Sequence, residues 1–127
     1  MGLDNGIVVR ATENNMVLKA LAPYKKDWCD EFEICYWRKC WNIRNDILNM
    51  LGKRFSEEWR HELTELDVDG ILSILDSYTE ENWDESGGSI WEYAEMAESL
   101  AEQKNALLLL KRLMCEHGVS AYFYDSY

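Results

Sequence analysis

Two charged residues, Glu33 and Arg44, interrupt the apolar side of the stretch EICYWRKCWNIRNDIL when it is drawn as a helix. At about 100° per residue, both fall inside a wide sector that holds most of the apolar side chains of the stretch. A buried guanidinium without a partner is strongly destabilising, so Arg44 either pairs with an acid or borders a cavity open to water. The second alternative predicts a small active site or ligand-binding pocket lined by Arg44, Tyr36 and Glu33.

The acid that would pair with Arg44 has to come from another element. Glu33 lies eleven positions away, which is about 16 Å along a straight helix. Four acidic residues lie in segments expected to flank this helix: Asp4, Asp76, Glu95 and Asp125. A paired Arg44 would fix the packing register, whereas an Arg44 at a cavity would bind a ligand, and the sequence leaves both interpretations open.

The negative charge of the chain is concentrated in its second half. The net charge is -11, and residues 64–127 hold 14 acidic but only 3 basic side chains, whereas residues 1–63 hold 10 of each. Such a surface repels phosphate backbones and suits a basic protein partner. The predicted contact residues are Glu92, Glu95, Glu98 and Glu102. Two other interpretations remain, in which the acidic surface serves solubility or imitates a nucleic acid and so inhibits a nucleic-acid-binding protein.

Metal and cofactor motifs are weak in this chain. The stretch ELDVDGILSILD, from Glu65 to Asp76, imitates a calcium-binding loop, but its first and last ligand positions carry the wrong acids. A helix capped by Asp67 or Asp69 explains the same residues more simply. The cysteines lack the spacing of a zinc site, and no catalytic set can be assembled around His61 or the other histidine. We therefore predict no metal, no cofactor and no catalytic residues.

The elements that would carry these residues are strands at both ends and helices between them. GIVVRAT and MVLKAL, joined by ENN, predict a β-hairpin at about residues 6–21. Periodicity predicts a central helix at about 26–52, ended by Gly52, and a helix from Ile90 to about Glu116, capped by Ser89 and ended by Gly118. Short helices are expected from Ser56 and up to about residue 78. The alternating VSAYFYDSY predicts a strand that pairs with the hairpin.

Composition is typical of one globular domain, spanning residues 1–127. Apolar residues make up 47% of the chain, including 6 Trp, which provides enough apolar surface for a core without disulfide bonds or metals. The longest apolar run is far shorter than a membrane span, and the N-terminus lacks a signal pattern. We expect a cytoplasmic α+β domain, mostly helical, in which the central and long C-terminal helices pack on a small antiparallel sheet.

Several short motifs resemble a family of small uncharacterised proteins encoded by bacteriophages and prophages. The chain opens with MGLD and carries YWRK at Tyr36–Lys39, followed by Ile43, a long acidic helix and an aromatic end. Members of the family open in the same way and carry Tyr-Trp-Arg-Lys-Ala-Asn-x-Ile-His. This chain departs from that pattern at Cys40, Trp41 and Arg44, which stand where the family has Ala, Asn and His. The resemblance implies a phage or prophage context and no particular reaction.

These observations favour a non-catalytic phage or prophage accessory protein that binds a protein partner through its acidic surface. We expect neither direct nucleic-acid binding nor membrane association. The alternatives are a small enzyme or ligand-binding module built around Arg44, and an inhibitor that mimics nucleic acid.

Overall fold

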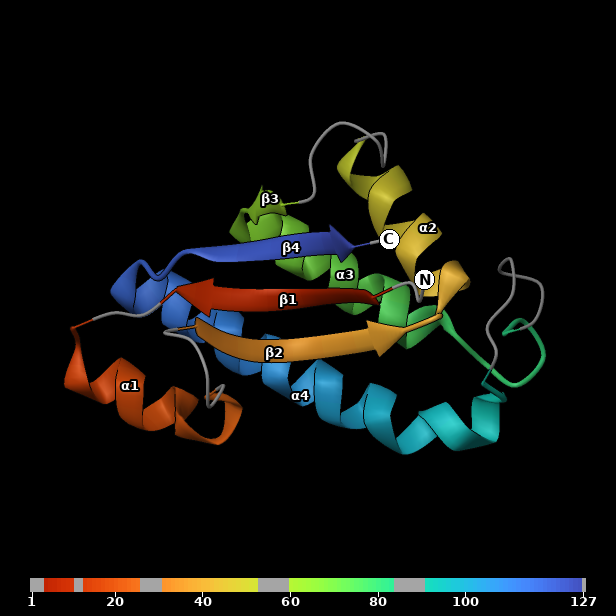
Figure 1. The fold of residues 1–127 in the computed structure, drawn as a ribbon, viewed down its shortest axis with the longest axis horizontal. Helices are drawn as coiled ribbons and strands as arrows, with labels where there is room; N and C mark the ends of the chain where they lie inside the picture. The colour runs from red at the N-terminus through yellow and green to blue at the C-terminus, as the bar shows by residue number, and fades with distance from the viewer. Residues whose placement is uncertain (1–3, 11–12, 26–30, 53–59, 84–90, 127) are drawn as a thin grey trace.

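A four-stranded antiparallel sheet forms the centre of the protein (Figure 1). The structure is a computed structural model that describes residues 4–10, 13–25, 31–52, 60–83 and 91–126. The order of the strands across the sheet is β2-β1-β4-β3. Their bounds are β1 Asp4–Arg10, β2 Glu31–Arg38, β3 Arg60–Leu63 and β4 Ala121–Ser126. The pairing of β4 with β1 confirms the predicted α+β class and the predicted role of the C-terminal strand.

The helices leave one face of the sheet open among the described residues. They are α1 Asn15–Leu21, α2 Trp41–Leu51, α3 Glu65–Ser77 and α4 Tyr93–His117, with a short 3-10 helix, η1, at Ala22–Tyr24. Figure 1 shows α3 and α4 passing behind the sheet, while the face toward the viewer carries no helix. We call that face the open face. None of the described helices is both long enough and apolar enough to cross a membrane.

Alternation along the strands and helical spacing along the helices bring the apolar side chains into one core. Ile7 and Val9 of β1 and Phe123 of β4 are at most 1% exposed and belong to the same cluster as the buried helix residues. Burial of each such side chain contributes about 1.5–3 kcal/mol, so this cluster holds the helices against the sheet. The helices supply Ile43 and Ile47 from α2, Val68, Ile71 and Leu75 from α3, and Leu100, Leu107, Leu110 and Leu113 from α4.

The predicted central helix at about 26–52 is wrong in its first half. Residues 31–38 form β2, and the helix α2 begins only at Trp41. The stretch EFEICYWR largely alternates buried and more exposed residues, interrupted by a bulge where Ile7 pairs with Cys35 but Val8 pairs with Glu33. This two-residue period is that of a strand. The unusually wide apolar sector on the wheel arose because a strand and a helix were drawn as one helix.

The predicted hairpin at about residues 6–21 is correct only in its first strand. MVLKAL lies in α1, and Asn14 caps that helix by accepting hydrogen bonds from the backbone N–H groups of Met16 (2.9 Å) and Val17 (3.2 Å). Asn is a favoured N-cap residue because its side chain satisfies these donors. The antiparallel partner of β1 on this side is therefore β2.

Other helix boundaries differ from the predictions near their N-termini. The helix predicted from Ser56 is wrong over residues 60–63, which form β3, while Ser56 itself lies outside the described residues. The N-cap of α3 is Thr64, and Asp67 supplies the reciprocal bond of a capping box. Similarly, Glu92 rather than Ser89 caps α4, and Ser89 lies outside the described residues.

The two glycines that were predicted to end helices are confirmed in that role. Gly52 follows α2 with φ 69°, and Gly118 follows α4 with φ 66°. Left-handed backbone at this position strongly favours glycine, which explains why these two ends could be located from sequence.

Candidate binding groove

Arg44 forms a closed, buried ion pair with Asp125. Its Nε lies 2.7 Å from Asp125 Oδ1 and its second guanidinium nitrogen lies 2.8 Å from Oδ2, so the contact is bidentate. Asn5 Nδ2 also donates to Asp125 Oδ1, at 2.6 Å. Arg44 is 1% exposed and Asp125 is 6% exposed. The pair joins α2 to the end of β4. Asp125 is one of the four acidic residues that were predicted as possible partners of Arg44.

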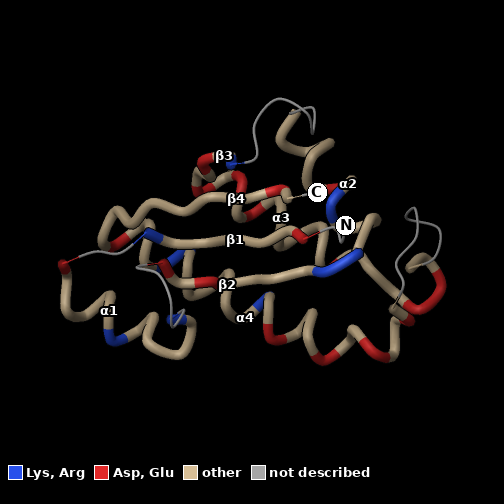
Figure 2. The backbone as a smooth tube through the Cα atoms, in the orientation of Figure 1, with Lys and Arg blue, Asp and Glu red and all other residues tan. Residues whose placement is uncertain are grey.

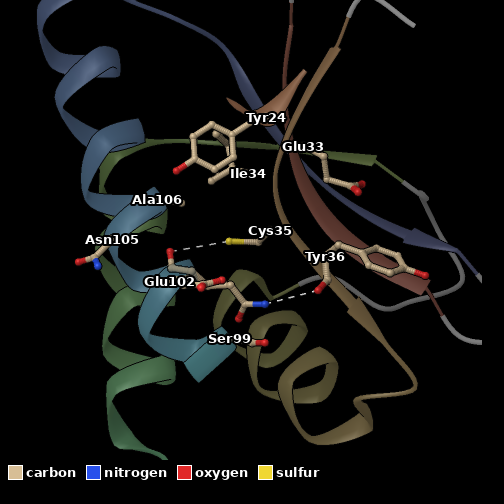
Figure 3. Close-up of a pocket in the computed structure, with 10 residues that line it drawn as sticks. Tyr24, Glu33, Ile34, Cys35, Tyr36, Ser99, Glu102, Asn105 and Ala106 are labelled. Carbon is tan, nitrogen blue, oxygen red and sulfur yellow. Dashed lines mark hydrogen bonds between the residues drawn. The ribbon is translucent and has the colours of Figure 1, made fainter. Parts of the chain in front are cut away.

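The three residues of the predicted pocket, Arg44, Tyr36 and Glu33, do not lie at one site. Glu33 and Tyr36 lie on β2 and line a cavity between β2 and α4, whereas Arg44 is not among the residues that line it. Figure 3 shows the Glu33 and Tyr36 side chains pointing away from α4. Arg44 therefore stabilises the fold in this structure, and the other two residues belong to a different site.

Tyrosines and carboxylates on different strands of the sheet bond to one another. Tyr124 OH donates to Glu33 Oε2 and Tyr36 OH donates to Asp4 Oδ1, each at 2.7 Å. Gly6 makes room for the first bond, since a Cβ at Gly6 would lie 2.6 Å from a Tyr124 ring carbon. Glu33 is thereby held from β4, although it belongs to β2.

These phenols remain protonated hydrogen-bond donors at physiological pH. Burial and the hydrogen bond to Asp4 raise the pKa of Tyr36 to about 12. Burial and the hydrogen bond to Glu33 also raise the pKa of Tyr124 above its ordinary value. A tyrosine that loses its proton only in strong alkali is a poor general base or nucleophile near neutral pH.

The cavity between β2 and α4 has a volume of about 460 Å³ (Figure 3). Its described charged lining residues are Glu33 and Glu102, both acidic. A second hollow of about 300 Å³ continues from it and shares Tyr36, Ser99 and Gln103. We call the two together the β2–α4 groove. The remaining residues of the first cavity are Tyr24, Ile34, Cys35, Asn105 and Ala106, and the second adds Trp37, Arg38, Cys40, Trp91, Glu95 and Met96.

Gln103 holds the two sides of the groove together. Its Oε1 accepts a hydrogen bond from Trp37 Nε1 at 2.8 Å, and its Nε2 donates to the Tyr36 carbonyl at 3.4 Å. The Cys35 thiol makes a longer contact of 3.9 Å with the Gln103 carbonyl. Burial, and secondarily the charge of Glu33, raises the pKa of Cys35, so the thiol stays protonated and is not a nucleophile.

The predicted acidic contact residues lie along the first half of α4. Glu92, Glu95, Glu98 and Glu102 are all exposed, and Figure 2 shows acidic positions along this part of α4. We call these four residues the acidic row. Glu102 lines the first cavity and Glu95 lines the second hollow. The structure therefore brings two of the predicted contact residues to the same groove as Glu33 and Tyr36.

The stretch that imitates a calcium-binding loop is helical throughout. Residues 65–76 all lie in α3, so their carboxylates point around a helix instead of converging. Asp69 pairs with Lys111 at 2.6 Å, and Asp76 pairs with Lys104 at 3.2 Å. Within the described ranges, no group of three or more His, Cys, Asp or Glu side chains is arranged to hold a metal ion.

Sequence reasoning missed most residues of the groove, including Tyr24, Ile34, Cys35 and Gln103. The signal that could have found the β2 side was the alternation in EFEICYWR, because a two-residue period is that of a half-buried strand. Gln103 carried no signal of its own. Comparison with protein-family models, curated proteins and solved structures found no match.

Proposed function

We propose that this protein is a non-catalytic binding protein that recognises a basic surface of a protein partner through the acidic row of α4. The phage or prophage accessory role suggested by the resemblance is part of this proposal. The observation that supports it best is the exposure of four glutamates along almost three turns at the start of one helix, two of which, Glu95 and Glu102, line a groove.

The basic residues nearest to this row along α4 are already engaged elsewhere. Lys104 pairs with Asp76 of α3, and Lys111 pairs with Asp69 of the same helix. No ion pair to Glu98 or Glu102 is found among the described residues. The charges of Glu98 and Glu102 are therefore available to an incoming cation, and clustered charge of one sign accelerates association with a partner of the opposite sign.

An enzymatic role has less support from the geometry. The guanidinium that could have bound a substrate is closed against Asp125, and the groove thiol stays protonated. A mimic of nucleic acid remains a narrower form of the binding proposal, in which the basic partner is itself a nucleic-acid-binding protein.

The test compares two variants that lose the same number of charges. One changes Glu92, Glu95, Glu98 and Glu102 to Gln, and the control changes four exposed glutamates elsewhere, Glu13, Glu65, Glu81 and Glu116, to Gln. Gln can still accept a capping hydrogen bond at the start of α4, so the helix should persist. Each protein is used to capture partners from a host lysate at increasing salt.

The proposal predicts that the row variant loses partners that the parent and the control retain, and that salt weakens their capture steeply. Recovery of the same partners by the row variant would contradict it. Partners that prove to be nucleic-acid-binding proteins would favour mimicry.

A further inference from the structure

The first cavity of the β2–α4 groove has walls of two kinds. Tyr24, Ile34 and Ala106 supply apolar and aromatic surface, while Ser99 and Glu102 supply polar groups from α4 (Figure 3). Its volume of about 460 Å³ lies within the range of about 300–1,000 Å³ typical of ligand pockets. A long side chain with an apolar stem and a polar tip fits both kinds of wall.

The charge of this cavity selects a cation. Glu102 on α4 is its charged side chain among the described lining residues, whereas the Glu33 carboxylate points away from α4 and accepts a hydrogen bond from Tyr124 (Figure 3). The second hollow has less preference for a cation, because a basic residue, Arg38, and an acidic residue, Glu95, both line it.

A partner strand could not pair with the backbone of β2 over the whole length of β2, because some of its backbone groups already have partners. The Trp91 indole donates to the Arg38 carbonyl at 2.8 Å, and Gln103 donates to the Tyr36 carbonyl. Lys25 forms an isolated bridge with Phe32 near the other end of the strand. A partner strand would have to displace these contacts, whereas an inserted side chain would not.

We propose that the β2–α4 groove binds a lysine or arginine side chain of an extended partner segment, with its aliphatic stem on Tyr24, Ile34 and Ala106 and its cation at Glu102. This rests on the proposed function, because it names the part of the partner that the acidic surface recognises. The Tyr24 ring adds an aromatic face, and such faces attract cations.

The probe is the blocked pentapeptide Gly-Gly-Lys-Gly-Gly, titrated into the isotopically labelled protein at low salt. Its control replaces lysine with norleucine, which keeps the stem and lacks the ammonium group. The lysine peptide should give saturable shifts at the amides of Ile34, Cys35, Gln103 and Ala106, and the norleucine peptide should not. Equal binding of the two peptides, or shifts confined to other surfaces, would overturn the proposal.

Two pairs of variants test whether the β2–α4 groove is the site that binds the peptide. Ser99→Trp fills the groove and should abolish the saturable shifts, whereas Ala101→Trp, on the exposed side of the same helix, should retain them. Glu102→Gln should weaken peptide binding about threefold to tenfold, and Glu116→Gln should change it less than twofold. Thermal midpoints confirm that each variant is folded. Unchanged binding by folded Ser99→Trp would overturn the proposal.

Partner capture by the Ser99→Trp variant and by the row variant separates the groove site from the acidic-row function. If Ser99→Trp captures partners like the parent while the row variant loses them, the groove is not the binding site for a lysine or arginine side chain. The proposed binding through the acidic row then stands. If the row variant captures partners like the parent, the proposed function is wrong.

Discussion

Replacing Arg44 with Met tests whether the buried ion pair holds the fold together. Met retains much of the apolar stem but removes the two hydrogen bonds to Asp125, at 2.7 and 2.8 Å. The Asp125 side chain, 3% exposed, keeps Asn5 as a donor but loses its counter-charge. Breaking a buried pair from one side costs about 3–5 kcal/mol, which is a large share of the roughly 5–15 kcal/mol by which domains are stable.

The assay is urea unfolding followed by tryptophan fluorescence, with thermal unfolding beside it. For a chain of this size, the predicted loss corresponds to a fall of roughly 10–20 °C in Tm. Arg112→Met is the control, because Arg112 is exposed on α4 and its replacement should change stability by less than about 0.5 kcal/mol. The double variant Arg44→Met, Asp125→Leu should recover part of the loss, since no uncompensated charge stays buried.

A different result would refute this reasoning. If Arg44→Met unfolds within about 2 °C of the parent, the guanidinium does not stabilise the fold through Asp125. Loss of ligand binding at nearly unchanged Tm would restore the pocket interpretation of Arg44.

Two further predictions concern the tyrosines that bond carboxylates on other strands. Gly6→Ala places a Cβ 2.6 Å from both the Tyr124 ring and the Cys35 carbonyl oxygen, so it should destabilise the protein by about 1–3 kcal/mol in urea unfolding; unchanged stability would contradict this packing. The pKa of Tyr36 is raised from 10.0 to about 12 in the folded state, so its contribution to stability is complete below about pH 10 and is lost as the pH rises toward 12. Tyr36→Phe should therefore flatten the fall of the urea midpoint between those pH values, and an unchanged slope would show that burial and the hydrogen bond to Asp4 do not raise this pKa.

The parts of the fold that could be predicted from sequence depend on local signals. GIVV and AYFYDS are apolar or aromatic runs without a helical period, and they form β1 and β4. Gly52 and Gly118 end helices because a left-handed residue is needed there. The charge of α4 could likewise be read directly, since exposed glutamates repeat every three or four residues.

The parts that could not be predicted depend on contacts between distant residues. The stretch from Glu31 to Leu51 changes from strand to helix at Lys39, whose φ of 54° carries no clear signal in a lysine. Asp125 pairs with Arg44 across 81 positions, and nothing local selects it over Asp4, Asp76 or Glu95. Glu33, Tyr36, Glu95 and Glu102 were assigned to two different sites, and only the packing of α4 beside β2 brings them to one groove.

The most direct test of the binding role is the affinity of a captured partner for the two charge-matched variants. At about 0.1 M salt, where the screening length is about 10 Å, the row variant should bind at least tenfold more weakly than the parent. The control variant, with the same net charge, should bind within about threefold of the parent. Equal affinities for both variants would contradict recognition through the acidic row. Its charge would then contribute only to the net negative charge of the protein.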